Sequence, residues 1–267
     1  LSRPASADVE GEIAIEFVDM PIADHHGAST NAAKVMVQRG VDCIVTLGGD
    51  GTNRVVSKGC LDVPLVPIST GTNNVFPANI EGTLAGIAAG SVATGVLTRD
   101  DVCRRSKRID IYVDSELHDE ALVDAAVSTP MFVGARAVWD TSTLHAMFLT
   151  RAEPASIGLS SIGSRLTPVS IDDQYGLYIR MDGKPGSNAT TVRAPVAPGT
   201  VSDVDIMDWR KIMPGEQIEI DLHPGTIALD GEREVELLPN QKVHAQLSTD
   251  GPWVVDVPHT MMLLANL

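Results

Sequence analysis

The residues Cys43-Ile44-Val45-Thr46-Leu47-Gly48-Gly49-Asp50-Gly51-Thr52 decide the fold of this 267-residue chain. They open as a short apolar run rich in β-branched residues, which is typical of a buried strand. The run breaks into glycines, and Arg54-Val55-Val56-Ser57-Lys58 can then start a helix. Such a turn leaves backbone N–H groups pointing outward, where glycine lets an anion come close. The stretch therefore predicts a phosphate-binding loop at the carboxyl end of a strand.

The carboxylate of Asp50 stands in the middle of this loop. A negative charge there weakens simple anion binding, so the residue needs another role. It can accept a proton from a hydroxyl, or hold a metal ion between phosphates. The structural alternative is an aspartate that fixes the turn by bonding nearby amides.

A second loop of the same kind follows the apolar run Pro64–Ile68. Its hydroxyls, amides and glycine can bond ribose hydroxyls or phosphate oxygens, and the members that we predict to bind a nucleotide are Thr70, Gly71, Thr72, Asn73 and Asn74. The alternative is an Asx-rich turn with self-contained hydrogen bonds. Helices are predicted around residues 29–39 and 81–94, and a further strand at Ile13–Val18. Alternating strands and helices predict a parallel doubly wound sheet, whose ligands lie beyond the carboxyl ends of the strands.

From about residue 108 the pattern changes to short strands separated by Gly, Pro and Asp-Gly turns. Strands at this spacing predict a β-sandwich-like unit. We therefore expect an α/β domain at residues 1–107 and a β-rich domain at residues 108–267. The basic residues Arg104, Arg105, Lys107 and Arg108 fall at the boundary, where a solvated linker is favoured over a phosphate clamp.

Gly48 to Thr52 resemble the GGDGT signature of NAD kinases, diacylglycerol kinases and sphingosine kinases. Pro67 to Pro77 resemble the branch of the ATP-NAD kinase family that includes acetoin-catabolism protein X. The resemblance covers most of the chain and is tight from Val41 to Pro77. It implies the NAD kinase and diacylglycerol kinase type of fold, with an α/β N-terminal domain and a β-rich C-terminal domain.

The resemblance also implies roles for individual residues. In NAD kinases the aspartate that matches Asp50 is regarded as the base that activates the acceptor hydroxyl. Other matching residues are implied to bind the nucleotide: Gly48, Gly49, Gly51 and Thr52 in the first loop, and Ser160 within the Gly/Ser-rich segment 156–164. That segment can also be a plain connector.

Two further positions depend on the resemblance. Where NAD kinases carry an Asn-Glu or Asn-Asp pair that binds the nicotinamide ribose, this chain has Val123 and Asp124, so Asp124 keeps the acid and the amide is lost. An aspartate among apolar neighbours is costly unless paired. Asp230-Gly231-Glu232 looks like an element of the lipid-kinase relatives, which makes Glu232 a candidate binding residue, but it is also an ordinary hairpin signal.

Composition limits the function classes. The net charge of −15 argues against nucleic acids and anionic membranes as partners. No stretch is long and apolar enough for a membrane span, and three scattered cysteines suit a reducing cytoplasm. The histidines show no metal-ligand spacing, and His118-Asp119-Glu120 is predicted to be an exposed turn.

We therefore predict an ATP-dependent kinase with Mg²⁺, whose best acceptor is the 2′-hydroxyl of NAD. The alternatives are a kinase of another alcohol, either a lipid or a small polyol, and a non-catalytic sensor of NAD or ATP. ATP and polyphosphate both remain open as phosphoryl donors. The resemblance implies a homo-oligomer assembled through the β-rich domain. Since relatives open with a further strand and the sequence begins at Leu1, we expect it to lack part of the natural N-terminus.

Overall fold

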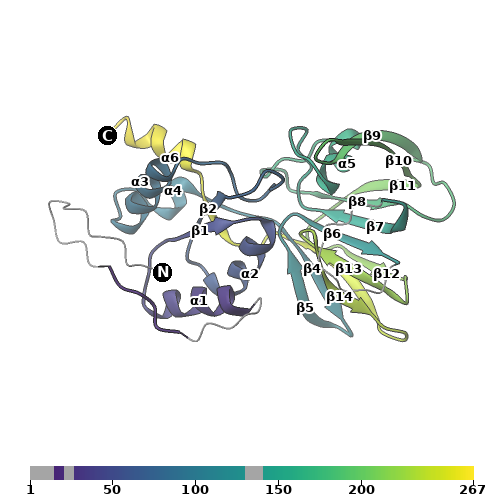
Figure 1. The fold of residues 1–267 in the computed structure, drawn as a ribbon, viewed down its shortest axis with the longest axis horizontal. Helices are drawn as coiled ribbons and strands as arrows, with labels where there is room; N and C mark the ends of the chain where they lie inside the picture. Colours follow the sequence, from purple (N-terminus) through teal and green to yellow (C-terminus); the bar gives the residue numbers. More distant parts are fainter. Residues whose placement is uncertain (1–14, 21–26, 130–140) are drawn as a thin grey trace.

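The computed structural model describes residues 15–20, 27–129 and 141–267. Figure 1 shows two units side by side, an α/β unit that carries α1, α2, α3 and α6 and a β-rich unit that carries most of the strands. This confirms the predicted fold class. Among the described helices, none has the length and apolar character needed to cross a membrane.

The α/β unit is built on a four-stranded sheet of order β1-β2-β16-β3. Strands β1 (Ile44–Gly48), β2 (Leu65–Ser69) and β16 (Trp253–Val255) are parallel, and β3 (Cys103–Arg105) is antiparallel to β16. Gly48 and Ser69 are register partners at the carboxyl ends of β1 and β2. The two predicted loops therefore leave the sheet next to each other.

Helices cover both faces of this sheet. Ile44 and Leu65 pack with α1 (Gly27–Gln38) and α2 (Asp50–Cys60). Val66, on the opposite face, packs with α3 (Gly82–Ala93), α4 (Arg99–Val102) and α6 (Val257–Leu264). The sheet is thus doubly wound, as the strand and helix pattern predicted.

The end of the chain returns to the α/β unit. After the last strand of the β-rich unit, β16 inserts between β2 and β3, and α6 packs beside α3. A division at residues 107 and 108 stays a prediction. We propose that the first domain also includes the returning residues 253–264.

The described strands of the β-rich unit form three sheets. A four-stranded sheet has the order β12-β15-β4-β5, a six-stranded sheet has the order β11-β8-β7-β6-β13-β14, and β9 and β10 form a two-stranded ribbon. The strands are β4 (Arg108–Val113), β5 (Glu116–Ala121), β6 (Asp124–Ser128), β7 (Leu144–Leu149), β8 (Gly176–Arg180), β9 (Thr190–Ala197), β10 (Thr200–Ile206), β11 (Asp208–Ile212), β12 (Gln217–Ile220), β13 (Gly225–Leu229), β14 (Glu232–Leu237) and β15 (Val243–Ser248).

The six-stranded sheet is buried on both faces. One face packs on the four-stranded sheet through residues such as Phe148, Ile227 and Ile111. The other packs on α5 (Leu159–Leu166) and the β9–β10 ribbon through Met147, Ile179 and Ile162. The 3₁₀ turn Thr141–Thr143 lies directly before β7. Strands β6 and β13 are therefore packed from both sides within the β-rich unit.

Several local predictions were wrong. Ile15 to Val18 form no strand, while residues 13 and 14 lie outside the described residues. His118-Asp119-Glu120 belong to β5 and are not a turn. Helix α2 begins at Asp50, earlier than the predicted start at Arg54, because residues Asp50–Asn53 already form its first turn.

The basic cluster at the boundary pairs with protein groups. Arg104 contacts Asp172 and Asp256, Arg105 contacts Asp62 and Asp250, and Arg108 contacts Asp110 and Glu120. Lys107 donates to the carbonyls of Ser170 and Tyr175. The cluster is therefore not the predicted solvated linker, since Arg104 and Arg105 lie in β3, Arg108 begins β4, and Lys107 is buried. The ion pairs of Arg104 and Arg105 form a charged seam between the two units.

Candidate functional site

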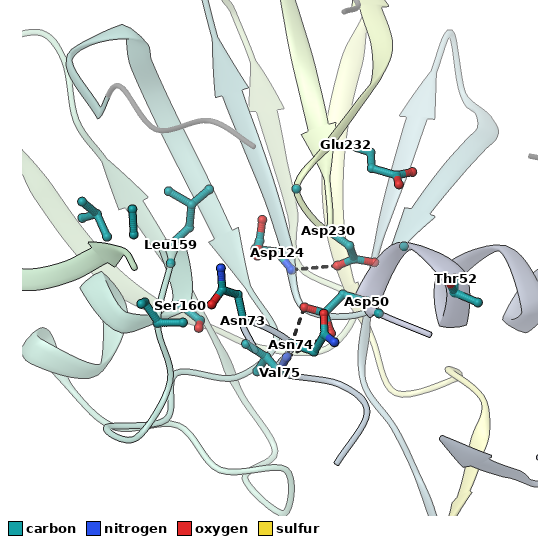
Figure 2. A pocket seen from close by; sticks show the side chains of 17 residues that line it. Asp50, Thr52, Asn73, Asn74, Val75, Asp124, Leu159, Ser160, Asp230 and Glu232 are labelled. Atoms are coloured by element: carbon teal, nitrogen blue, oxygen red, sulfur yellow. Dashed lines mark hydrogen bonds between the residues drawn. The ribbon is translucent and has the colours of Figure 1, made fainter. Parts of the chain in front are cut away.

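A cavity of about 420 Å³ lies between the two units, next to the carboxyl ends of β1 and β2. Figure 2 shows acidic and amide side chains from both units directed into it. The α/β unit contributes Gly49, Asp50, Gly51, Thr52, Asn73, Asn74 and Val75, and the β-rich unit contributes Asp124, Ile157, Gly158, Leu159, Ser160, Val196, Ala197, Asp230, Gly231 and Glu232. Neither unit forms the site alone.

Asp50 is the first residue of α2 and is held by the second loop. Its Oδ1 accepts the backbone N–H of Phe76 at 2.7 Å, and the carboxylate accepts the N–H of Val75 at 3.0 Å. The N-terminus of a helix also favours a negative charge. Burial nevertheless raises the pKa of Asp50 above its usual value, opposed by these hydrogen bonds and by Arg151. The carboxylate is thus fixed in direction and has a raised proton affinity, which suits a general base.

Gly49 and Gly51 allow side chains of the neighbouring loops to come close. A Cβ at Gly49 would lie 2.8 Å from Oδ1 of Asn74, and a Cβ at Gly51 would lie 2.8 Å from Oε1 of Glu232. Asn74 is itself held by a hydrogen bond from Nδ2 to Oγ of Ser69. The glycines of this loop therefore serve close packing between loops.

Gly49→Ala is expected to lower the free energy of unfolding by about 1–3 kcal/mol, because Asn74 must move away from a restrained position. Gly86→Ala is the matched control, since a Cβ there meets nothing within 4 Å and Gly86 lies inside α3. It should instead stabilise the protein by about 0.4–1 kcal/mol. Urea unfolding of both variants measures the two changes in the free energy of unfolding. Equal changes in the two variants would contradict this role of Gly49.

Asp230 ties the β13–β14 turn to β6. Its carboxylate accepts the backbone N–H groups of Leu122 at 2.9 Å, Val123 at 2.7 Å and Asp124 at 3.1 Å. Asp230 has a φ of 51°, the left-handed conformation that a tight Asp-Gly hairpin turn requires. Burial raises its pKa to about 7 against these hydrogen bonds. Asp230 thus organises the wall that faces Asp50.

Asp124 is the most isolated of the acids. Its side chain is buried, and its Oδ1 has no hydrogen-bond partner among the described residues. Burial raises the pKa of Asp124 well above its usual value, and the charges of Asp230 and Asp50 raise it further. Both effects favour the protonated carboxyl over the carboxylate.

Asp124→Asn is expected to raise the Tm by about 2–8 °C at pH 8. Since the folded pKa of Asp124 is raised, the folded state holds a proton that the unfolded chain releases, and stability falls as pH rises through the folded pKa. Asparagine removes this dependence, so the gain should shrink at pH 5. Thermal unfolding at both pH values is the measurement. A gain in Tm that is equal or larger at pH 5 would contradict a role for the ionisation of Asp124.

Arg54 connects helix α2 to acidic residues of the β-rich unit. It follows Asp50 by one helical turn on α2, and its side chain is fully buried. Its Nη1 lies 3.3 Å from Oδ1 of Asp119 in β5. Its Nε lies 3.9 Å from Oδ2 of Asp230, and its Nη2 lies 3.4 Å from Oε2 of Glu232. Arg54 thereby sets the position of the β13–β14 turn relative to α2.

The predicted site residues divide into two groups. Those brought together around the cavity are Gly49, Asp50, Gly51, Thr52, Asn73, Asn74, Asp124, Ser160 and Glu232. Gly48, Thr70, Gly71 and Thr72 are not among its lining residues. Thr72 donates to Oδ1 of Asn73, which favours the self-contained turn for this pair. Residues 159–164 of the segment 156–164 belong to α5, so most of the segment is helix and not a connector, and Ser160 is hydrogen-bonded to Ser156.

Three residues beside the acids are not predicted by the sequence patterns, namely Arg54, Arg151 and Asp230. Asp230 belongs to the Asp230-Gly231-Glu232 motif, in which the prediction names only Glu232 as a binding residue. Arg54 could have been suspected from its place one helical turn after Asp50. Within the described residues, no group of three His, Cys, Asp or Glu side chains is placed to hold a metal ion.

Two family models match this chain. The model of the ATP-NAD kinase N-terminal domain matches residues 11–101, and the model of the acetoin catabolism protein X C-terminal domain matches residues 107–250. Acetoin catabolism protein X of Cupriavidus necator is 38% identical over 265 residues, which are 98% of this chain and 73% of that protein.

A solved structure, the yeast NADH kinase complexed with NADH, is similar with 14% identity and a TM-score of 0.48. The match covers 84% of this chain but only 66% of that one, just under two thirds. The family is shown by the domain models and the curated relative. The chain therefore belongs to the acetoin catabolism protein X branch of the ATP-NAD kinase family.

Proposed function

We propose that the protein is an ATP-dependent kinase that transfers the γ-phosphoryl group to a hydroxyl, with the 2′-hydroxyl of NAD as the best acceptor. One observation carries the proposal. The carboxylate of Asp50 is held by two backbone N–H groups at the wall of a cavity that also presents Asn73, Asn74 and Asp124. A directed carboxylate among ribose-binding groups suits the activation of an alcohol.

In this reaction Asp50 accepts the proton of the acceptor hydroxyl. The freed oxygen forms a bond to the γ-phosphorus while the bond from that phosphorus to the bridging oxygen breaks and ADP leaves. The raised pKa of Asp50 brings its proton affinity closer to that of the hydroxyl. Orientation and charge neutralisation supply most of the acceleration in phosphoryl transfer.

Mg²⁺ fits the donor set of the cavity. Magnesium is bound by one or two carboxylates together with substrate phosphates, without a complete protein cage. Asp124, with its unpaired Oδ1, would hold it, and the ion would favour ionisation of that carboxyl. When bound, the ion neutralises phosphate charge. ATP is proposed as donor, and polyphosphate is the alternative.

Fewer contacts support NAD as the acceptor than support the type of reaction. Val123 is fully buried and packs with Leu122 and Phe76, so the side chain at the position of the usual asparagine lies in the core and not in the site. Asp124 remains directed into the cavity (Figure 2). A lipid or small polyol is therefore the second candidate acceptor. The three free thiols Cys43, Cys60 and Cys103 support the proposal of a cytoplasmic protein. A homo-oligomer stays a prediction.

The test is a coupled assay with Mg-ATP and NAD that measures NADP formation. NADP formation supports the proposal. Consumption of ATP only with another alcohol would support the kinase and overturn NAD as acceptor. Tight binding of ATP or NAD in calorimetry without turnover would favour a non-catalytic sensor.

A further inference from the structure

Arg151 is a buried cation that the proposed reaction has not yet used. It follows β7 by two residues, and only 6% of its surface is exposed. Its Nη1 donates a hydrogen bond to the carbonyl oxygen of Val75 at 3.3 Å. Its guanidinium lies over the ring of Phe76, 5.3 Å from the ring centroid. The residue comes from the β-rich unit and contacts a loop of the α/β unit.

Val75 and Phe76 are the residues whose N–H groups hold Asp50. Arg151 binds the carbonyl of the first and the ring of the second. The same short segment therefore connects the guanidinium to the carboxylate. Loss of the arginine would free a segment whose N–H direction determines where the carboxylate points.

The charges around Asp50 are mostly negative. Asp124 on β6, Asp230 in the β13–β14 turn and Glu232 on β14 line the same cavity, and no lysine or arginine does so among the described residues. Arg54 is already in contact with Asp119, Asp230 and Glu232. Arg151 opposes the effect of burial and lowers the pKa of Asp50. The ionisation of a buried acid that has one nearby cation depends strongly on that cation.

We propose that Arg151 is a positioning residue for Asp50, which fixes the Val75–Phe76 segment and supplies the positive charge that keeps the carboxylate ionised. The catalytic part of this inference rests on the proposed function, because it takes Asp50 as the base. The effect on ionisation does not depend on turnover and can be measured without substrate.

The experiment follows the ¹³C signal of the Asp50 carboxyl by NMR as pH changes, assigned by its loss in Asp50→Asn. Arg151→Gln keeps a donor for the Val75 carbonyl but removes the charge, and should raise the midpoint by about one pH unit. Arg151→Lys keeps the charge and should stay near wild type. Arg104→Met is the control, since its partners Asp172 and Asp256 do not line the cavity.

An unchanged midpoint in folded Arg151→Gln would overturn the proposal. If that variant does not fold, Arg151→Lys decides, because lysine keeps the positive charge, and a midpoint raised by a full pH unit in Arg151→Lys would overturn the proposal. With an active enzyme, Arg151→Gln should move the acidic limb of the kcat profile to higher pH by about one pH unit, with the KM for NAD within threefold. Failure to form NADP would overturn the proposed function while leaving the NMR result intact.

Discussion

Asp50→Asn is expected to lower kcat for phosphoryl transfer by about 10²–10⁴-fold. The amide oxygen of asparagine can still accept the N–H of Phe76, so the loop between β2 and α3 keeps its main contact. What disappears is the ability to take the proton of the acceptor hydroxyl. Steady-state rates of NADP formation give the effect, and calorimetry should show binding of NAD within a few-fold of wild type.

Asp62→Asn is the matched control for this change. Asp62 pairs with Arg105 in the seam between the two units and lies outside the cavity. Its replacement should leave kcat within twofold of wild type. If Asp50→Asn retained more than a tenth of the wild-type kcat, the carboxylate would not be the base, and positioning alone would have to explain the activity.

Arg54→Met is expected to lower the free energy of unfolding by about 3–5 kcal/mol, the usual cost of removing one partner from a buried charge cluster. Methionine fills much of the space but leaves Asp230, whose side chain is fully buried, without its neighbouring cation. Asp119 would still contact Lys58 at 2.6 Å. Urea unfolding measures the loss. Because Asp230 and Glu232 also line the cavity, activity should fall as well.

The pH dependence separates this mechanism from simple loss of packing. Burial raises the pKa of Asp230 to about 7, so the carboxyl is mostly protonated at pH 5 and needs the cation less. The stability lost in Arg54→Met should therefore be smaller at pH 5 than at pH 8. Arg193→Met, which breaks an exposed pair with Asp203, should cost less than about 1 kcal/mol. A loss that does not change with pH would assign the role of Arg54 to packing.

Local patterns were sufficient for most of the architecture. Apolar runs that end in glycine or polar loops predicted β1 and β2, and alternation with Asp-Gly turns predicted many strands of the β-rich unit. These patterns work because a buried strand and a tight turn each need particular residue types within a few positions. The strand predicted to include Ile15 to Val18 does not form, because an apolar run alone does not provide a neighbouring strand.

The sequence by itself determined the doubly wound unit, the β-rich unit and the glycine loop with Asp50, because these depend on neighbours along the chain. Only the tertiary structure decided that Asp230 caps β6 across a sequence separation of over a hundred residues, and that Arg54 and Arg151 lie beside the acids. It also decided that Val123 turns into the core while Asp124 faces the cavity. The reason is physical. Burial and charge proximity depend on distances between segments, which follow from how the two units pack.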